Sequence, residues 1–311
     1  MKLLMKEKEL AGKFERALTD FRFKGKPLVG IAKPENVSAL VAQLIESEHR
    51  IRYVARIAER PISPKRLDPK DELFDPLRAA IAHMHAGNAD EGFWLVFLFV
   101  HFGKNLKHGY SLLRAIYGAF EDQFIWTWEK YSQKPADFSL WFHDRLPQME
   151  KVRGKLKFGN HRKYESIYQT EQVFESYLNW VGPERSHAAL LGRVMDAVGN
   201  DPKRLFDYLY SSMYADVFRF GRTGAFDYLT MLGKIGLARI EAPSAYMANA
   251  TGPARGVRLL FGGDPTYNIA AKDLDGLAIE LGAALGVGMQ VIEDSLCNWQ
   301  KSPGQFIAFR G

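Results

Sequence analysis

Acidic, amide and amine side chains with catalytic potential gather between residues 248 and 301 of this 311-residue chain. The carboxylates are Asp273, Glu293 and Asp294, and Lys272 and Lys301 supply amines. A fixed carboxylate can stabilise a developing positive charge, and a lysine can act either as a nucleophile or as a phosphate contact. The pattern therefore identifies candidate catalytic residues. It does not distinguish hydrolysis from lyase chemistry.

The last predicted helix places some of these groups on one face. Apolar residues recur at intervals of three and four and form one face, namely Leu285, Met289, Ile292, Leu296 and Trp299. Gln290, Asp294, Asn298 and Lys301 form the opposite face. A solvated helix surface would show the same pattern, but the density of functional groups makes Asn298 a further catalytic candidate.

A second carboxylate stands near a predicted turn. We expect a short helix over residues 243–250, a tight turn at 251–254 and a second helix over 255–261. Asp273 follows and precedes a predicted helix over 276–286, where it would serve equally well as a helix N-cap. The turn residues Thr251, Gly252, Ala254 and Arg255 are candidate phosphate contacts.

The strongest local signal for nucleic acid is the stretch at residues 151–163. Six of its thirteen residues are Lys or Arg, two are glycine, and none is acidic. Such a loop binds a phosphate backbone by releasing counterions, so Lys155, Lys157, Arg162 and Lys163 are candidate DNA contacts. A solvated basic loop is the alternative interpretation. Arg222, at a predicted helix junction, either binds a phosphate or pairs with Asp227 inside the fold.

Composition sets the remaining limits. The chain is 47% hydrophobic and carries a formal charge of +6, which suits a globular protein with a polyanionic partner. A single cysteine, Cys297, excludes a disulfide framework, and the histidine spacings lack the pattern of a helical metal site. No apolar stretch reaches the roughly 20 residues of a membrane span. We expect a cytoplasmic protein without a metal, a cofactor or a membrane association.

Helical periodicity recurs along the chain, and no two-residue alternation is long enough for a sheet, so the predicted fold class is all-α. We expect helices over residues 37–60, 170–181, 186–198 and 202–220, and a buried central helix containing residues 93–100. Prolines and charges at residues 61–75 predict a connector. This divides the chain into an N-terminal helical segment, residues 1–60, and a larger helical domain, residues 61–311.

The turn and the aspartate beyond it resemble the helix-hairpin-helix of the DNA glycosylase superfamily. In that superfamily a turn offers backbone N–H groups to a DNA phosphate, and an aspartate follows somewhat under twenty residues later. Asp273 stands at that distance, although Thr251-Gly252-Pro253 inverts the usual proline-glycine order. The resemblance implies a glycosylase-like helical bundle, and the connector at residues 61–75 leaves open whether it has two lobes. A plain helix–turn–helix corner remains the alternative.

A narrower resemblance covers most of the chain from about Arg56 onward. The segments that carry it are residues 101–104, 220–228, 251–253 and, most specifically, 290–301. They are similar to the alpha-glutamyl/putrescinyl thymine pyrophosphorylase family, clade 3, which is regarded as a derivative of the DNA glycosylase fold associated with hypermodified pyrimidines of phage DNA. A related bacterial group is implicated in excising glucosylated cytosines from viral DNA.

The resemblance implies an activity on modified bases without choosing between building and removing them. Excision requires base extrusion and a carboxylate near the sugar, which Asp273, Asp294 or Glu293 can supply. Displacement of pyrophosphate usually requires a phosphate cradle, and the sequence contains no Gly-rich P-loop. We therefore expect a glycosylase that excises a bulky modified pyrimidine from phage DNA. A base-modifying transferase is the second hypothesis and a non-catalytic DNA-binding module the third; the oligomeric state stays open.

Overall fold

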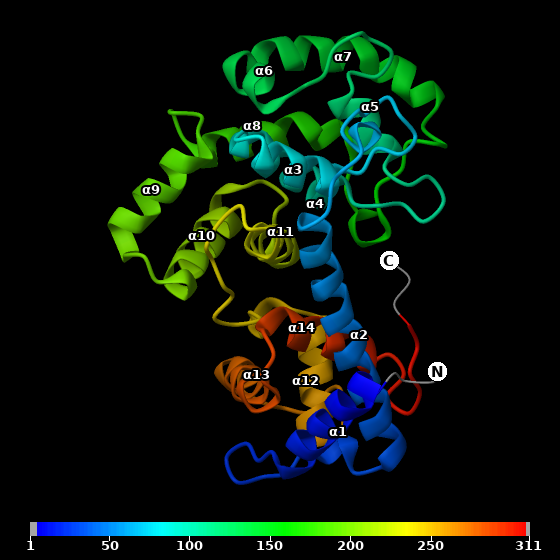
Figure 1. The fold of residues 1–311 in the computed structure, drawn as a ribbon, viewed down its shortest axis with the longest axis vertical. Helices are drawn as coiled ribbons and strands as arrows, with labels where there is room; N and C mark the ends of the chain where they lie inside the picture. Colours follow the sequence, from blue (N-terminus) through cyan, green and yellow to red (C-terminus); the bar gives the residue numbers. More distant parts are fainter. Residues whose placement is uncertain (1–4, 309–311) are drawn as a thin grey trace. The chain divides into compact units, whose positions relative to one another are not determined.

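The computed structural model describes residues 5–308, and within them the protein is all-α, as predicted. Fourteen α-helices and five short 3₁₀ turns form the regular structure of this part of the chain (Figure 1). The only β pairing among the described residues is two isolated bridges, at Phe23 with Lys26 and at Asn105 with Gly109.

The chain forms two compact units that are not contiguous in sequence. The first unit joins the N-terminal residues up to Val54 to the segment that begins at Ala242, and the second unit spans Ala55–Glu241. The first and the last described segments of the chain thus share one unit. The division into residues 1–60 and 61–311 follows a different boundary and stays a prediction about domains.

The first unit contains five α-helices: α1 (Met5–Asp20), α2 (Pro34–Ala58), which continues beyond Val54, α12 (Gly252–Gly262), α13 (Ala271–Leu285) and α14 (Met289–Trp299). A common apolar core includes Phe14, Leu40, Leu260, Leu277 and Trp299. Helices α12 and α14 pack closely, because a Cβ at Gly256 would lie 2.4 Å from the Leu296 carbonyl oxygen.

Within the described residues, no single helix is both long and apolar enough to cross a membrane. Helices α13 and α14 meet the length and composition criteria only as a pair, with a bend of 109° between them.

The second unit contains nine helices: α3 (Pro76–His85), α4 (Ala89–Phe102), α5 (Ser111–Tyr117), α6 (Trp128–Gln133), α7 (Pro135–Lys151), α8 (Thr170–Val181), α9 (His187–Val198), α10 (Pro202–Asp216) and α11 (Arg222–Ile235). Helix α4 is the predicted buried helix, and Trp94 and Phe97 within it are 0% exposed. Aromatic rings surround it, with Phe97 stacked on Tyr177 at 3.7 Å and on Phe220 at 4.8 Å. The helix is buried because its apolar residues cover every side.

Short polar side chains define where several helices begin. Asp75, Asn88, Ser186 and Asp201 each accept a hydrogen bond from a backbone N–H in the first turn of α3, α4, α9 and α10. These caps satisfy donors that lack a partner inside the helix. Helix α8 has the predicted bounds, and α9 begins one residue after the predicted start because Ser186 is its cap.

Four local predictions are wrong. Residues 243–250 contain only the 3₁₀ turn Met247–Asn249, and Gly252 to Ala254 form the first turn of α12 instead of a separate turn. The carboxylate of Asp275 explains the first difference, because it accepts hydrogen bonds from Ser244 Oγ at 2.5 Å and from Met247 N at 2.9 Å. These bonds hold the segment in a non-helical conformation.

The other two differences concern helix ends. Helix α13 begins at Ala271, so Asp273 lies within its first turn and is not the residue that caps it. Helix α10 ends at Asp216, before the predicted residue 220, because Val217 has extended backbone angles (φ −92°, ψ 111°).

Candidate functional site

In the first unit, Asp294 lies at the centre of a connected set of polar side chains on α2 and α14. Its Oδ2 accepts hydrogen bonds from Ser47 Oγ at 2.6 Å and from the Arg50 guanidinium. Its Oδ1 accepts one from Asn298 Nδ2 at 3.0 Å, and Lys301 Nζ donates to Asn298 Oδ1 at 3.0 Å. The structure therefore brings together three predicted site residues, Asp294, Asn298 and Lys301.

These contacts fix the Asp294 carboxylate without enclosing it. Its side chain is 25% exposed, and Arg50 is held on its other side by Glu46 at 3.0 Å. Several donors to one carboxylate fix its orientation. Asp294 can therefore stabilise a nearby cation or orient a water molecule, and the same bonds also join α2 to α14. Glu293 precedes it on α14 and is half-buried.

Asp273 has a different partner. Its carboxylate forms an ion pair with Lys24 at 2.7 Å, and the side chains of Asp273 and Lys24 are 22% and 59% exposed. Lys272 is exposed beside it in the first turn of α13. Among the described residues, no hydrogen bond joins Asp273 to the Asp294 set, so the two candidate carboxylates belong to separate groups of contacts.

The predicted turn residues lie at the start of α12. Thr251 and Arg255 are exposed, and Gly252 is half-buried beside Cys297, whose Sγ would lie 2.8 Å from an added Cβ. Ala254 is 3% exposed, so its side chain packs into the core. Of these residues, only Thr251 and Arg255 present their side chains to solvent.

In the second unit, the basic loop separates into two kinds of residue. Lys155, Lys157 and Lys163 are exposed, whereas Arg162 is 4% exposed. Arg162 donates from Nε to the His101 carbonyl at 3.3 Å and from Nη1 to Tyr164 OH at 3.1 Å, and its guanidinium lies over the Phe220 ring at 5.0 Å. Arg162 therefore stabilises the fold in this conformation.

Arg222 is also buried. It is 6% exposed and its guanidinium lies 4.8 Å from the centre of the Phe226 ring. A cation over an aromatic face contributes to stability inside a protein. Like Arg162, Arg222 thus differs from the exposed lysines of the basic loop.

A second basic segment lies beside the loop and was not predicted. Residues 103–111 and 151–164 together contain no acidic residue. They are joined by hydrogen bonds from Gly159 N to Phe102 O (2.7 Å), Asn105 Nδ2 to Phe158 O (3.0 Å) and Ser111 Oγ to Lys155 O (2.6 Å). The exposed cations of both segments form what we call the basic surface: Lys104, Lys107, Lys151, Arg153, Lys155, Lys157 and Lys163.

A cavity of about 250 Å³ opens between these segments, and we call it the loop cavity. Asn105, which follows α4, lines it together with Lys157, Phe158 and Lys163. The cavity therefore lies near the C-terminal end of this buried helix. Lys157 and Lys163 of the basic loop therefore border a partly open cavity as well as solvent.

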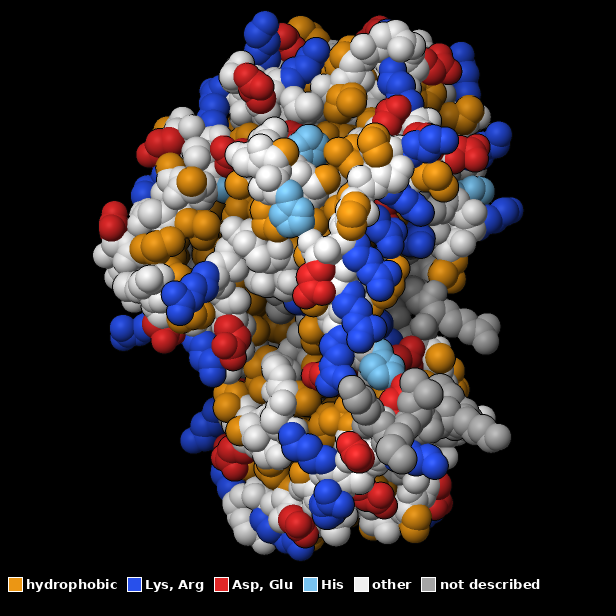
Figure 2. Space-filling model, viewed as in Figure 1, with side chains coloured by type: hydrophobic (Ala, Val, Ile, Leu, Met, Phe, Trp, Pro, Cys, Tyr) orange, Lys and Arg blue, Asp and Glu red, His pale blue; other side chains and the backbone are white. Residues whose placement is uncertain are grey.

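Helix α2 carries a further row of cations. Figure 2 shows Lys and Arg side chains gathered over this helix, where Arg52 and Arg56 are exposed and lie four residues apart on one face. Arg52 pairs with Glu48 at 3.2 Å. The sequence shows the same four-residue spacing of arginines, but it predicted only a helix over residues 37–60 there.

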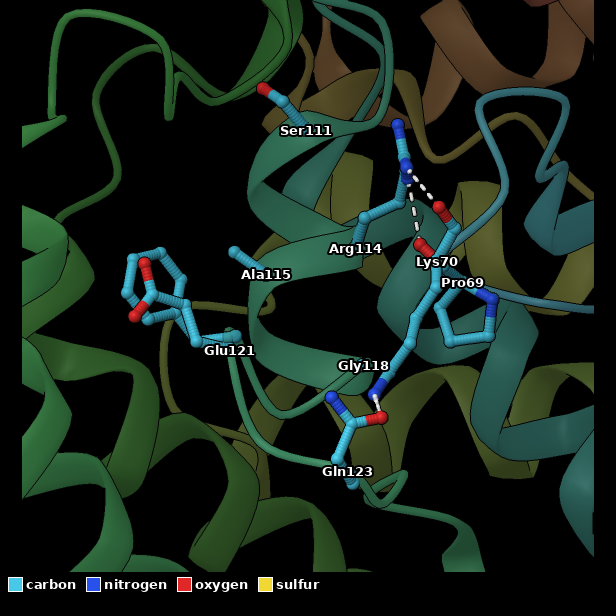
Figure 3. A pocket seen from close by; sticks show the side chains of 9 residues that line it. Pro69, Lys70, Ser111, Arg114, Ala115, Gly118, Glu121 and Gln123 are labelled. Carbon is cyan, nitrogen blue, oxygen red and sulfur yellow. Dashed lines mark hydrogen bonds between the residues drawn. The ribbon is translucent and has the colours of Figure 1, made fainter.

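A larger hollow of about 380 Å³ lies beside α5 (Figure 3). Its cations are already engaged: Arg114 donates from Nε to Pro69 O at 2.8 Å and from Nη2 to Lys70 O at 3.0 Å. Lys70 Nζ donates to Asp122 O at 2.6 Å and to Gln123 Oε1 at 3.1 Å. These bonds join the connector before α3 to α5 and to the segment after it. Arg114 and Lys70 therefore stabilise the fold at this hollow.

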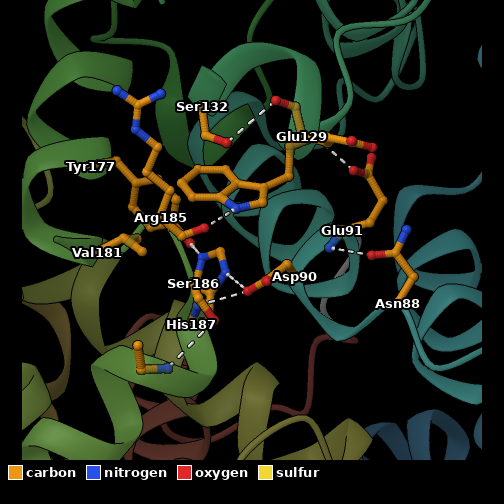
Figure 4. Close-up of polar contacts among 12 residues, drawn as sticks. Asn88, Asp90, Glu91, Glu129, Ser132, Tyr177, Val181, Arg185, Ser186 and His187 are labelled. Carbon is orange, nitrogen blue, oxygen red and sulfur yellow. Dashed lines mark hydrogen bonds and ion pairs between the residues drawn. The ribbon is translucent and has the colours of Figure 1, made fainter. Parts of the chain in front are cut away.

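The second unit also contains a buried histidine network that no sequence pattern predicted (Figure 4). Asp90 Oδ1 accepts from His187 N and from His187 Nδ1, both at 2.7 Å. His187 Nε2 lies 2.7 Å from Tyr177 OH, which lies 2.7 Å from Tyr228 OH. The network fixes one tautomer: Nδ1 carries the proton, and Nε2 accepts from Tyr177.

Burial lowers the pKa of His187 despite the opposing effect of Asp90, so the ring is neutral near pH 7. Burial raises the pKa of Asp90, but the hydrogen bonds from His187 outweigh it and the net shift is downward. His187, Tyr177 and Tyr228 are each 0% exposed. The network therefore supports the helices around it. Of its four residues, Asp90 alone reaches solvent, with a side chain that is 36% exposed.

Glu91 lies next to this network and was also missed. It is 2% exposed, and its oxygens accept from Tyr117 OH at 2.5 Å and from Trp128 N at 2.6 Å. Burial raises the pKa of Glu91 to about 7, although both hydrogen bonds act in the opposite direction. Glu91 is thus a buried carboxyl group that titrates near neutral pH.

The family model for alpha-glutamyl/putrescinyl thymine pyrophosphorylase clade 3 matches residues 35–311. The chain belongs to this family. The match covers the Asp294 set, the basic loop and most of the described helices, and it bears out the resemblance seen in the sequence. Neither the curated proteins nor the solved structures give a match to this chain.

Proposed function

We propose that this protein is a DNA N-glycosylase that excises a bulky modified pyrimidine, hydroxymethylated or glucosylated, from phage DNA and leaves an abasic site. The observation that carries the proposal is the Asp294 carboxylate, which donors from Ser47, Arg50 and Asn298 hold while its side chain stays 25% exposed. Cleavage of an N-glycosidic bond develops positive charge on the sugar, and a prepositioned carboxylate stabilises that charge. Membership in a thymine-modification family supports a modified base as the substrate.

The basic surface supports DNA as the partner. Its seven exposed cations come from two segments without an acidic residue, and such a surface attracts a polyanion and releases counterions when it binds. Thr251 and Arg255 at the start of α12 are proposed as additional phosphate contacts, since a helix N-terminus presents unpaired N–H groups. Asp273 is the second candidate for the catalytic carboxylate.

The family description favours a second candidate function, a transferase that replaces pyrophosphate on an activated thymine with an amine. In that reaction the base stays on its sugar and gains mass. Excision instead releases the base and leaves the strand sensitive to alkali. The two functions therefore give different products from the same DNA.

The test is to incubate the protein with unmodified, hydroxymethylated and glucosylated DNA and to analyse released bases and alkali-labile sites. Excision predicts a free modified base and new alkali-labile sites on a modified substrate. A parallel reaction on DNA that carries pyrophosphorylated hydroxymethyluracil, with putrescine or glutamate added, tests the transferase through pyrophosphate release and a mass gain. Absence of free base on every substrate would count against the glycosylase.

A further inference from the structure

The loop cavity combines a cationic mouth with an apolar wall. Lys157 and Lys163 line it and are exposed, and neither forms an ion pair with another described residue. The apolar part of its lining consists of Leu112, Met149, Leu156, Phe158 and Ile167. A ligand that fits this arrangement has an anionic end and a flat or apolar body.

The acidic residues of the lining do not cancel this positive charge. The Glu165 side chain is 0% exposed and pairs with Arg219 at 2.7 Å. Glu150 lies 3.4 Å from Arg153, and a hydrogen bond between Glu150 and Tyr168 raises the pKa of that tyrosine. Each carboxylate is thus matched by an arginine, and Lys157 and Lys163 remain as uncompensated charges.

The backbone holds the cavity in shape. Gly159 packs against Gly103 so closely that an added Cβ would lie 2.7 Å from Lys104 N. Asn105 connects the two segments through its bond to Phe158 O, and its Oδ1 accepts from Lys107 N and His108 N, both at 3.0 Å. The two sides of the cavity are therefore fixed by hydrogen bonds before a ligand arrives, which lowers the entropy cost of binding.

The volume limits the size of the ligand. About 250 Å³ is below the roughly 300–1,000 Å³ that drug-sized ligands occupy, so the cavity suits one small molecule or one unit of a polymer. A phosphate with a single attached nucleoside has the required anionic end, and its base supplies a flat face for an aromatic or apolar wall.

We propose that the loop cavity binds one nucleoside monophosphate unit, with Lys157 and Lys163 on the phosphate and the base against the apolar wall. This unit is either a free mononucleotide or one nucleotide of a single DNA strand. The site differs from the Asp294 set, and it does not depend on which reaction the protein performs.

The experiment measures binding of thymidine 5′-monophosphate, thymidine, inorganic phosphate and the trinucleotide TpTpT to the full chain by calorimetry. Lys157→Ala and Lys163→Ala each remove a charge-assisted contact and are expected to weaken binding about tenfold. Leu156→Trp fills the cavity without changing charge and is expected to abolish binding. The matched control, Lys65→Ala with Lys134→Ala, removes two charges from exposed positions outside the basic surface and leaves binding within about twofold of wild type.

Tighter binding of the monophosphate than of thymidine or phosphate alone, lost in Leu156→Trp, supports the proposal. Competition between the trinucleotide and the monophosphate identifies a DNA strand as a source, and binding of the monophosphate alone identifies a free nucleotide. Equal affinity for phosphate and the monophosphate, or equal losses in the cavity and control variants, overturns the proposal. None of these results depends on base release, so failure of the glycosylase activity is a separate outcome.

Discussion

Asn298 donates two hydrogen bonds to the residue one helical turn before it, to Asp294 O and to Asp294 Oδ1, both at 3.0 Å. Its own Oδ1 accepts from Lys301 Nζ at 3.0 Å, which fixes the orientation of the amide. The Asp294 carboxylate is therefore surrounded by donors from both α2 and α14. This geometry is what a charge-stabilising carboxylate requires, and it yields the first prediction.

Asp294→Asn is expected to lower the rate of base excision by orders of magnitude and to leave DNA affinity similar. Loss of the charge affects the transition state far more than the ground-state complex. Single-turnover assays and DNA-binding measurements on the same samples separate the two effects. Thermal unfolding serves as the folding control, since the substitution also removes the ionic partner of Arg50.

Asp273→Asn is the matched comparison, because Asp273 also has one basic partner and a similar exposed fraction. If Asp294 is the catalytic carboxylate, Asp273→Asn retains activity. An inactive Asp273→Asn beside an active Asp294→Asn would transfer the catalytic role to α13. If both variants remain active, neither carboxylate is catalytic.

The second prediction concerns the salt dependence of DNA binding. Replacing Lys155, Lys157 and Lys163 with alanine is expected to reduce the slope of log K against log salt by about 0.9 for each duplex phosphate that the variant no longer neutralises. Fluorescence anisotropy across a salt series measures the slope. Lys65, Lys134 and Lys203 are exposed lysines elsewhere in the second unit, and their triple alanine variant is the control. Equal slopes for both triple variants would identify the basic loop as solvated surface.

Arg162 provides the third prediction. Arg162→Ala removes the donors to His101 O and Tyr164 OH from a site that is 4% exposed, so we expect a loss of about 1–3 kcal/mol in the free energy of unfolding. Lys163→Ala removes the same charge from an exposed position and is expected to change stability by less than about 0.5 kcal/mol. Urea unfolding compares them, and equal stabilities would contradict the structural role.

Local sequence signals predicted much of the helical fold and little of the tertiary structure. The end of α8 and the start of α9 were predictable because Gly182 and Ser186 mark helix ends through local backbone chemistry. The absence of a helix at residues 243–250 could not be predicted locally, because the hydrogen bonds that prevent the helix come from Asp275, about thirty residues later in the chain. Such long-range bonds override local helix propensity.

The candidate site shows the same limit. The periodicity of α14 placed Asp294, Asn298 and Lys301 on one face, and they do form one set of hydrogen bonds. Ser47 and Arg50 were missed because nothing local connects α2 to α14, which lie more than 240 residues apart. Burial cannot be read from the sequence either. Arg162 lies in the same basic stretch as the exposed lysines, and its hydrogen bond to His101 O and its contact with the Phe220 ring distinguish it only in the folded protein.

The last prediction concerns pH and Glu91, whose pKa burial raises from 4.5 to about 7. Below pH 4.5 the group is protonated in both the folded and the unfolded chain. Between 4.5 and 7 the unfolded chain releases the proton while the folded chain keeps it, so stability falls as pH rises, and above 7 the loss is complete. At 1.36 kcal/mol per pH unit this loss is about 3 kcal/mol.

Glu91→Gln removes this titration and keeps the shape of the side chain. Its amide oxygen can accept from Trp128 N, and its NH₂ can donate to Tyr117 OH, since a phenol both donates and accepts. The stability of Glu91→Gln relative to wild type is therefore expected to rise by about 3 kcal/mol between pH 4.5 and 7.5, measured by urea unfolding. Glu72→Gln, at an exposed position, is the control and should show no such rise. A difference between Glu91→Gln and wild type that stays constant with pH would mean that Glu91 ionises at its ordinary pKa.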